Sequence, residues 1–279
     1  MLRTEGYFHG YDGKDLYFQT WQQEEAKLHL MITHGLAEHS GAYKYLAEGL
    51  MSDLPVNIYA WDLRGHGRSY GKRGVVKNFS EYTKDLFCFY HFLKDQINDL
   101  PVCLGHSMGG LILTYALSLY EEQIKTKALV LSSPLFGVKM EVSPFKEYAA
   151  RLLSDFAPSI ALNNEIDFKS LSHDKKIIQE YENDALRHNK ISSRVYLGFI
   201  ETFPKVMAAA AKLQMPVFLQ YSGDDHLVSV SATEKFYDLL GSSEKEKIKY
   251  TSMYHEIYNE VDRELVYKDL IKYLRKYIA

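Results

Sequence analysis

Residues 102–116, VCLGHSMGGLILTYA, contain the feature that decides the fold. Within them, residues 105–109 fit the pattern G-x-S-x-G, with a short apolar run before it and a helical pattern after it. In that context the serine lies on a sharp, strained turn from strand to helix, and the glycines let the two elements pack closely. The turn exposes the hydroxyl above a sheet and directs the N-terminus of the new helix towards it. The pattern predicts that Ser107 is a nucleophile; the alternative is an ordinary glycine-rich turn.

Strand-like and helix-like patterns alternate on both sides of this turn. Apolar side chains at three- and four-residue steps, from Phe79 to Ile97, predict an amphipathic helix over 79–97. Because short apolar runs separate such helices, the sequence predicts the α/β class, with a mostly parallel sheet covered on both faces. The expected strands are 14–22, 27–33, 56–61, 102–104, 127–131, 216–221 and 248–252, and the other expected helices are about 42–51, 108–120, 231–240 and 261–277.

The alternation stops after Pro134. From about residue 137 to about residue 211 the patterns are helical, with no convincing strand. We expect this segment to be a cap over the edge of the sheet where the parallel strands end, because ligands bind there in open α/β sheets. The first cap helix is expected to begin with Ser143 as N-cap and Pro144 in its first turn. The other cap helices are expected at about 173–188 and 192–211. The expected parts are a core at 1–136, the helical cap at 137–211 and the rest of the core at 212–279.

A carbonyl attacked by serine needs two N–H donors aimed at the oxygen that becomes negative. Removing one such donor typically lowers the rate by about 10²–10³. One donor is expected to be the backbone N–H of Met108, the residue after the nucleophile. The other is expected from residues 33–41, THGLAEHSG, which end a strand, and we assign it to Leu36. A plain turn is the alternative interpretation of this loop.

The acid and the base are expected later in the chain, at the ends of two further strands. Residues 222–226, SGDDH, directly follow the strand expected at 216–221, so that an acid emerges at the same edge. Asp225 is our choice for the acid, and Asp224 is the alternative. His255, between the last strand and the last helix, is the expected base. The alternative is a structural histidine packed by neighbouring tyrosines.

The other histidines near these motifs receive structural interpretations. His226 abuts the acid and is badly placed to bridge it to the serine. His173 and His188 fall on cap helices among polar neighbours and are expected at the surface. His106 is expected to pack inside the turn around the nucleophile. His66 belongs to a loop, DLRGHGRS, whose two arginines could bind phosphate, although such loops more often hold themselves together by Asp–Arg and backbone hydrogen bonds.

The composition argues against several classes of protein. Lys and Arg number 33 and Asp and Glu 36, for a formal charge of -3. No long run has one sign, which argues against nucleic acid as a partner and against a polybasic membrane anchor. No run reaches about 18 apolar residues, and the N-terminus lacks the apolar core of a signal peptide.

Cys88 and Cys103 are expected to be buried free thiols in a reducing cytosol. No metal-ligand spacing or phosphate-binding glycine loop is present, so neither a metal nor a cofactor is expected. The oligomeric state stays open.

Together these motifs resemble the monoacylglycerol lipase and lysophospholipase branch of the α/β-hydrolases. The matching segments, in order, are 34–35 with 38–43, then 62–69, 105–110, 222–226 and 254–256. The resemblance implies an α/β-hydrolase fold, with an eight-stranded sheet and a helical cap inserted after the sixth strand. It also implies Ser107 as nucleophile, Asp225 as acid, His255 as base, and Leu36 and Met108 as oxyanion donors. The acid loop departs from the family by having Asp225-His226 where Asp-Pro is frequent.

These residues predict a two-step acyl transfer. His255 takes the proton of Ser107, which attacks an ester of a lipid-like substrate, a monoacylglycerol or a lysophospholipid, and water then releases the acyl group. The apolar face of the first cap helix, with Phe145, Tyr148 and Leu152, is expected to line a tunnel for the acyl chain. Its alternatives are ordinary packing and transient contact with a membrane surface. The alternative functions are a carboxylesterase for short-chain esters, a carbon–carbon bond hydrolase and a cofactor-free haloperoxidase.

Overall fold

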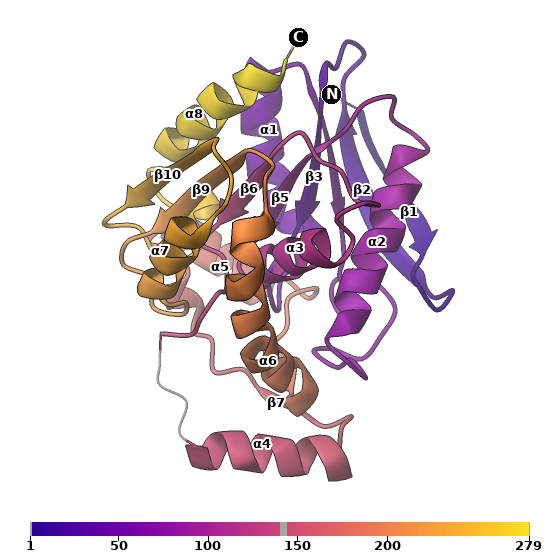
Figure 1. Ribbon diagram of the computed structural model, residues 1–279, viewed down its shortest axis with the longest axis vertical. Coiled ribbons are helices and arrows are strands. Elements are labelled where there is room, and N and C mark those ends of the chain that lie inside the picture. The colour runs from indigo at the N-terminus through magenta and orange to yellow at the C-terminus, as the bar shows by residue number, and fades with distance from the viewer. Residues whose placement is uncertain (1, 140–143, 279) are drawn as a thin grey trace.

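The computed structural model describes residues 2–139 and 144–278, except for the side chains of 144–147 and 149. One sheet of eight strands forms its centre, in the order β1-β2-β4-β3-β5-β6-β9-β10 (Figure 1). The pairs β1–β2 and β2–β4 are antiparallel, and the other neighbouring pairs are parallel. The predicted fold class, a mostly parallel eight-stranded α/β sheet, is therefore confirmed. The strands are β1 (Leu2–His9), β2 (Asp15–Gln22), β3 (Leu28–Thr33), β4 (Val56–Trp61), β5 (Val102–His106), β6 (Leu129–Ser132), β9 (Val217–Ser222) and β10 (Lys245–Tyr250).

Alternate side chains of the central strands enter two separate hydrophobic cores, one on each face of the sheet. In β3, Met31 joins the first core, whereas Leu30 and Ile32 join the second. In β5, Cys103 joins the first core and Leu104 the second. Because both faces of these strands are buried, both sets of side chains are apolar. This is why the central strands stand out in the sequence as continuous apolar runs.

Helices cover both faces of the sheet, as predicted (Figure 1). The helices α1 (Lys44–Asp53) and α8 (Arg263–Leu274) lie side by side on the second core. The helices α2 (Ser80–Lys94), α3 (Met108–Leu119) and α7 (Val230–Leu239) pack on the first core. Short 3₁₀ helices are η1 (Ser40–Tyr43), η2 (Phe168–Ser170), η3 (Ala210–Lys212), η4 (Ile257–Asn259) and η5 (Arg275–Tyr277).

The two edge strands differ from the sequence-based expectation. The sequence pattern did not predict β1, most of whose side chains are exposed, so that no alternation of buried and exposed residues marks it. The last strand begins at Lys245, before the expected range 248–252, and its sequence KEKIKY is mostly charged. Edge strands are held by backbone pairing on one side, and charged side chains keep other chains from adding to them. Hydrophobic periodicity is therefore a weak guide to such strands.

The segment between β6 and β9, which we call the insertion (residues 137–211), contains more than helices. Besides α4 (Pro144–Phe156), α5 (Lys175–Asn183) and α6 (Ser193–Ala209), it forms an antiparallel pair of short strands. The expectation of no strand was wrong, because β7 (Ala161–Asn163) and β8 (Lys190–Ser192) are too short to show a periodicity of two.

The second helix of the insertion is also shorter than the expected range 173–188. It begins after Asp174, whose side chain accepts from the N–H of Lys176. It ends before Asp184, whose side chain accepts from the N–H of Leu186. These short polar side chains favour caps and turns over helix interiors. The N-cap expected at Ser143 lies outside the described residues.

Among the residues that the structure describes, no helix combines the length and the apolar character needed to cross a bilayer. Both cysteines are free thiols: Cys103 is buried in β5, and Cys88 is half-buried in α2. The two residues thus belong to separate elements.

Candidate active site

Ser107 lies at the sharp turn between β5 and α3, as predicted. Its backbone has φ 52° and ψ -121°, a region that side chains other than glycine rarely adopt. The backbone carbonyl oxygen of Ser107 accepts from the N–H of Leu135, at 2.9 Å. The backbone N–H of Ser107 donates to the carbonyl oxygen of Ser132, at 3.0 Å. A Cβ at Gly109 would lie only 2.1 Å from the carbonyl oxygen of Thr33. The close packing of strand and helix around the turn therefore requires glycine.

The structure brings Ser107, His255 and Asp225 into one chain of contacts. The Oγ of Ser107 lies 2.9 Å from Nε2 of His255, and Nδ1 of His255 lies 2.7 Å from Oδ2 of Asp225. The other carboxylate oxygen of Asp225 accepts from the N–H groups of Leu227 and Val228, at 2.8 and 2.9 Å. This anchors the carboxylate, so that Nδ1–H of His255 donates to it and Nε2 faces the serine hydroxyl.

The rival acid points elsewhere. Asp224 is about half-exposed and pairs with His226 instead, Oδ1 to Nε2 at 3.2 Å. Asp225 follows β9 and His255 follows β10, so both leave the sheet at the edge where β5 ends. Of the two candidate carboxylates, only Asp225 contacts His255 among the contacts described.

Burial and charge shift the pKa values of His255 and Asp225 in opposite directions. Burial by itself would lower the pKa of His255, but the charge and hydrogen bond of Asp225 outweigh it and raise that pKa above 6.5. Burial by itself would raise the pKa of Asp225, yet His255 and the two backbone donors bring it below its ordinary value. The carboxylate thus stays ionised at neutral pH and favours the protonated imidazole.

The loop after β3, residues 34–39, closes over Ser107. A Cβ at Gly35 would lie 3.1 Å from the Cβ of Ser107, so the loop and the serine approach closely. The carboxylate of Glu38 accepts from the N–H of Gly35 and from the hydroxyl of Tyr43, and these bonds fix the loop from within. Leu36, the expected oxyanion donor, lines the same pocket as Ser107.

The second expected donor is at the start of a helix. Met108 is the first residue of α3 and directly follows Ser107. The first N–H groups of a helix have no partner within the helix, and the helix dipole adds positive potential there. The N–H of Met108 is therefore suited to stabilise an oxyanion next to the serine.

The insertion binds the β3 loop from outside. Nδ1 of His39 accepts from the N–H of Gly41, so its proton lies on Nε2, which donates to Asp184 at 2.7 Å. The N–H of His188 donates to the carbonyl oxygen of Ala37, at 3.1 Å. The conformation of the loop is therefore tied to the position of the insertion.

A buried arginine joins this loop to the segment that carries the base. Arg187 contacts Glu256 at 3.2 Å and Glu38 at 3.7 Å, and the three side chains are each at most 5% exposed. The hydroxyl of Tyr181 donates to Glu256 as well. Burial and the negative charge of Glu256 raise the pKa of Glu38 to about 7. Burial would raise the pKa of Glu256 too, but Arg187 outweighs it and holds that pKa low.

The sequence did not indicate a role for these residues. Glu38 and Glu256 stand within the quoted motifs, and their position next to functional residues was the available signal. Arg187 lies in the insertion, far from both carboxylates along the chain, and no sequence pattern marked it. A buried ion pair between distant segments becomes visible only when the chain is folded.

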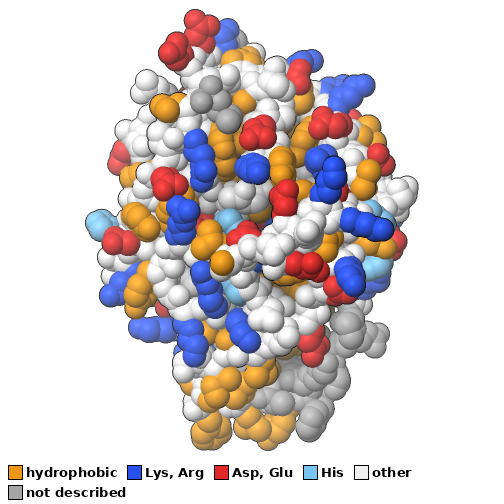
Figure 2. Space-filling model, turned by 180° about the vertical axis from the view of Figure 1, so that it is seen from behind, with side chains coloured by type: hydrophobic (Ala, Val, Ile, Leu, Met, Phe, Trp, Pro, Cys, Tyr) orange, Lys and Arg blue, Asp and Glu red, His pale blue; other side chains and the backbone are white. Residues whose placement is uncertain are grey.

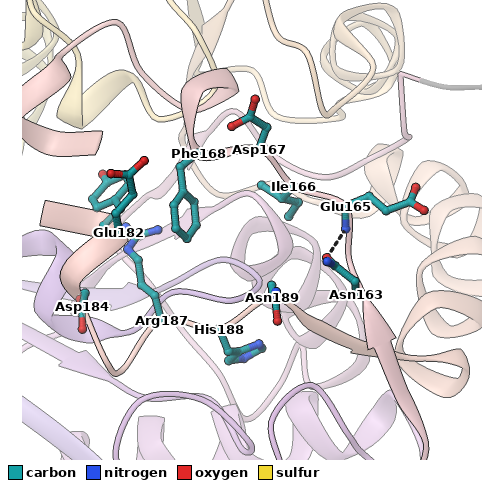
Figure 3. Close-up of a pocket in the computed structure, with 11 residues that line it drawn as sticks. Asn163, Glu165, Ile166, Asp167, Phe168, Glu182, Asp184, Arg187, His188 and Asn189 are labelled. Carbon is teal, nitrogen blue, oxygen red and sulfur yellow. Dashed lines mark hydrogen bonds between the residues drawn. The ribbon is translucent and has the colours of Figure 1, made fainter. Parts of the chain in front are cut away.

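Two adjacent pockets lie at this site. The inner pocket, beside Ser107, is lined mainly by the β3 loop, by His255 and by the insertion. The outer pocket, of about 510 Å³, lies entirely within the insertion (Figure 3). Both pockets are lined by Ile166, Phe168, Arg187 and His188, so they are adjacent.

The residues expected to line an acyl tunnel lie elsewhere. Tyr148 and Leu152 are 61% and 41% exposed on α4 and line neither pocket. In Figure 1, α4 lies at the end of the molecule remote from the sheet. The side chain of Phe145 lies outside the described residues. The periodicity found an apolar helix face correctly, but it cannot tell what that face contacts. The apolar side chains that do line the inner pocket are Leu36, Ala37, Ile166, Phe168, Leu171 and Leu227.

The structural histidines are as expected with two exceptions. His173 is exposed as expected, but it lies just before α5 instead of on a helix, and its Nδ1 lies 2.8 Å from Oε1 of Glu260. His106 is buried beside His255, with ring centroids 4.9 Å apart, and His226 is partly exposed. His188 is not a surface residue on a helix: it lies beyond the end of α5 and lines both pockets. Burial lowers its pKa to about 4, so the ring is neutral. His66 is fully buried beside it, with ring centroids 4.7 Å apart.

The loop around His66 binds itself and its neighbours. Asp62 accepts from the N–H groups of Ser40 and Arg68, at 2.7 and 2.8 Å. Arg64 is almost fully buried and pairs with Asp12 and Asp85, outside the loop. The arginine is thus engaged with carboxylates, which fits the structural interpretation of this motif.

Sequence comparisons give the family. A family model described as serine aminopeptidase, S33, matches residues 24–262. The phospholipase YtpA of Bacillus subtilis (strain 168) is 30% identical over 263 residues, which cover 93% of this chain and 99% of that protein. The human monoglyceride lipase is 31% identical over 255 residues, which cover 90% of this chain and 82% of that protein.

Solved structures agree in the fold. The crystal structure of the monoacylglycerol lipase of Paleococcus ferrophilus superposes with a TM-score of 0.83 at 25% identity, covering 94% of this chain and 99% of that one. A soluble variant of the monoglyceride lipase of Saccharomyces cerevisiae superposes with a TM-score of 0.88 at 21% identity, covering 100% and 97%. The chain therefore belongs to the serine aminopeptidase S33 family, in the monoacylglycerol lipase and lysophospholipase branch of the α/β-hydrolase superfamily.

Proposed function

We propose that this chain is a carboxylic ester hydrolase that acts on lipid-like esters, monoacylglycerols or lysophospholipids, through an acyl-enzyme on Ser107. The observation that carries the proposal is the contact chain from Ser107 through His255 to Asp225. It joins a nucleophile, a base and an orienting carboxylate with hydrogen-bond distances at both links. Monoglyceride lipases and a phospholipase among its relatives support esters of lipids as the substrates.

The reaction proceeds in two steps. His255 removes the proton of Ser107 as Oγ attacks the ester carbonyl, and it then gives the proton to the departing alcohol. Water attacks the acyl-enzyme by the same route and releases the carboxylic acid. In both steps the N–H groups of Leu36 and Met108 bind the oxygen that becomes negative. Asp225 stays ionised, holds the imidazole in the required tautomer and stabilises the imidazolium.

The insertion acts in this proposal as a separate cap unit between the two parts of the core, 1–136 and 212–279. Its contacts with the β3 loop and with Glu256 support that role, since they set the shape of the pocket beside Ser107. Apolar side chains of the inner pocket, such as Leu36, Phe168 and Leu171, would contact the start of the acyl chain. A lipid-like acyl group thus suits the site better than a short acetyl group.

A panel of substrates and an active-site label test the proposal. We expect a fluorophosphonate probe to label Ser107 stoichiometrically, and a p-nitrophenyl ester and lauroylglycerol to be hydrolysed. Ser107→Ala should abolish both the labelling and the hydrolysis, whereas Ser118→Ala, on the helix that follows Ser107, should change neither. Absence of labelling on the folded protein would refute the acyl-enzyme.

Other outcomes would point to the competing functions. Hydrolysis confined to acetate and butyrate esters would indicate a short-chain carboxylesterase. Cleavage of a carbon–carbon bond, peroxide-dependent halogenation or faster hydrolysis of an aminoacyl anilide, each without turnover of lipid esters, would contradict the proposal. The same protein preparation serves for all of these assays.

The exposed face of α4 supports transient contact with a membrane surface as part of the proposal. Figure 2 shows hydrophobic side chains gathered at the end of the molecule that α4 occupies in Figure 1. The large apolar side chains exposed there are Tyr148, Leu152, Phe156, Ile160 and Leu162. An apolar patch of this kind on a helix face is typical of a surface that enters the lipid interface.

Vesicle binding tests this contact. Replacing both Leu152 and Phe156 by serine should lower the fraction bound to phosphatidylcholine vesicles by about tenfold, because each side chain contributes apolar area. Leu239→Ser, at an exposed apolar position on α7, is the matched control and should leave binding unchanged. Equal sedimentation of the wild type and the double variant with vesicles would exclude this surface.

A cytosolic location, from which the protein reaches lipid, remains part of the proposal and rests on the two free thiols.

A further inference from the structure

The loop that carries His255, residues 253–256, which we call the base loop, is held by a backbone N–H group on each side of the imidazole. The N–H of Tyr254 donates to Oε1 of Glu260, at 2.7 Å. The N–H of Glu256 donates to the carbonyl oxygen of Leu171, at 2.8 Å. Glu260 follows η4 in the core, whereas Leu171 belongs to the insertion. The direction of the imidazole therefore depends on one carboxylate of the core and on one backbone group of the insertion.

The carboxylate of Glu260 is a buried junction of four hydrogen bonds, with its side chain 2% exposed. Oε1 accepts from the N–H of Tyr254 and lies 2.8 Å from Nδ1 of His173. Oε2 accepts from the N–H groups of His173 and Val261, at 3.0 and 3.1 Å. Three of these four partners are backbone donors, which pair with an ionised carboxylate, so Nδ1 of His173 donates as well. One side chain thus joins the base loop to the insertion.

The ring of His173 also packs on the base loop. The rings of His173 and Tyr254 are stacked, with their centroids 3.6 Å apart and their planes at 27°. The ring of His226, the residue after the acid Asp225, lies 4.6 Å from the ring of Tyr254 between centroids. Tyr254 therefore contacts both the insertion and the loop that carries the acid, and the next residue in the chain is His255.

Further contacts fix the segment of the insertion that contains His173. The hydroxyl of Ser172 donates to the carbonyl oxygen of Asn259, at 2.8 Å. The guanidinium of Arg263, in α8, donates to Oδ2 of Asp174, at 2.9 Å. Asp174 is also the N-cap of α5. The start of α5 is thus attached to the segment that follows the base loop, and a shift of this part of the insertion would move the imidazole of His173.

The imidazole of His255 has to satisfy two short contacts at once. It lies 2.9 Å from Oγ of Ser107 and 2.7 Å from Oδ2 of Asp225. A displacement of the ring along the line between these two atoms lengthens one contact or the other. Misplacement by about 1 Å can lower the rate of an enzyme by about 10²-fold. The rate is therefore sensitive to how the residues on each side of His255 are held.

We infer that His173 and Glu260 are positioning residues, which keep the imidazole of His255 aligned for proton transfer. Glu260 holds the backbone of Tyr254, and His173 joins that carboxylate to the insertion. Neither His173 nor Glu260 lines the inner or the outer pocket, so their effect reaches the reaction only through the base. The docked insertion is thereby a condition for an aligned base. The inference rests on the proposed function, in which His255 is the general base.

Two substitutions of His173 separate its hydrogen bond from its ring. His173→Phe keeps a flat ring against Tyr254 but offers no donor to Glu260. His173→Asn loses the ring, while its side-chain NH₂ group takes the place of Nδ1–H. The side chain of His173 is 43% exposed, so both variants should fold. We expect His173→Phe to lower kcat for a p-nitrophenyl ester by about tenfold at unchanged KM, and His173→Asn to stay within about threefold of the wild type.

Glu260→Gln tests the junction itself. The amide has the same shape, but one of the two oxygens becomes an NH₂ group that faces other donors, so kcat should fall by about tenfold or more. His9→Phe is one matched control, because Nδ1 of the exposed His9 also pairs with a carboxylate, that of Asp15. Glu264→Gln, at an exposed position in the first turn of α8, is the other. Both controls should leave kcat unchanged.

Counting the active sites separates alignment of the base from stability of the fold. Exhaustive labelling with the fluorophosphonate probe gives the number of competent sites in each preparation, and kcat is expressed per labelled site. We expect a lower kcat per site and slower labelling in His173→Phe and Glu260→Gln, because the same imidazole activates Ser107 in both reactions. Fewer sites with the kcat per site of the wild type would show a purely structural role and overturn the inference.

The two His173 variants also decide by themselves if Glu260→Gln does not fold. An equal loss of kcat per site in His173→Phe and His173→Asn would mean that the hydrogen bond to Glu260 is not the means of alignment, and it too would overturn the inference. In either case a wild type that is labelled and hydrolyses esters leaves the proposed function standing. A wild type that is neither labelled nor active would instead remove the proposed function.

Discussion

Asp225→Asn is expected to lower kcat for a p-nitrophenyl ester by about four orders of magnitude while the protein stays folded. The carboxylate accepts from Nδ1–H of His255, which leaves Nε2 free to take the proton of Ser107. An asparagine amide can turn its NH₂ group towards Nδ1 and favour the wrong tautomer. It also cannot stabilise the imidazolium that forms in the transition state.

The neighbouring aspartate provides the control. Asp224→Asn changes a half-exposed side chain that pairs with His226, so we expect kcat within about threefold of the wild type. The reverse result would transfer the acid role to Asp224. Each variant is checked by circular dichroism before the assay.

The pH profile gives a second readout of the same substitution. Activity needs neutral His255, so kcat/KM of the wild type should fall as the pH drops through a pKa that lies above 6.5. Without the charge of Asp225, burial lowers that pKa, and the acid limb of the variant should move to lower pH. An unchanged limb would mean that another group titrates.

Arg187→Met should destabilise the folded protein by about 3–5 kcal/mol, because it leaves two buried carboxylates without their cation. The methionine keeps most of the apolar volume, so the loss measures charge compensation more than packing. The stability of Arg187→Lys should lie between that of the wild type and that of Arg187→Met, because one ammonium group cannot span both carboxylates as a planar guanidinium does. Urea unfolding, monitored by circular dichroism, gives the free energy of unfolding for each variant.

The matched control is Arg275→Met, at an exposed position near the C-terminus, which should change the stability by less than about 0.5 kcal/mol. A further variant tests the cause. Adding Glu38→Gln to Arg187→Met removes one of the orphaned charges and should restore part of the stability. If Arg187→Met unfolds at the same urea concentration as the wild type, the ion pairs of Arg187 with Glu38 and Glu256 contribute no net stability.

The core of the fold and the three residues in contact could be predicted from the sequence. The turn at Ser107 has a local pattern because its backbone conformation and close packing demand glycines. Asp225 and His255 could be found because parallel strands end at one edge, so residues just after β9 and β10 are brought to the residue just after β5.

The insertion could be located but its contacts could not be predicted. An apolar helix face at 144–156 has the same periodicity whether it packs, lines a tunnel or meets solvent, and Tyr148 is in fact exposed. Arg187 lies on a connecting segment, where no periodic pattern exists, and its partners come from two distant loops. Such long-range polar contacts depend on the whole tertiary arrangement.

The place where the insertion leaves the sheet has an evolutionary consequence. The chain departs after β6 and returns at β9, and these two strands are direct neighbours in the sheet. Any segment whose ends fit the short distance between β6 and β9 can replace the insertion, and the hydrogen bonds of the sheet stay intact. New selectivities can therefore arise by recombination above the sheet while the reaction chemistry is inherited unchanged below it.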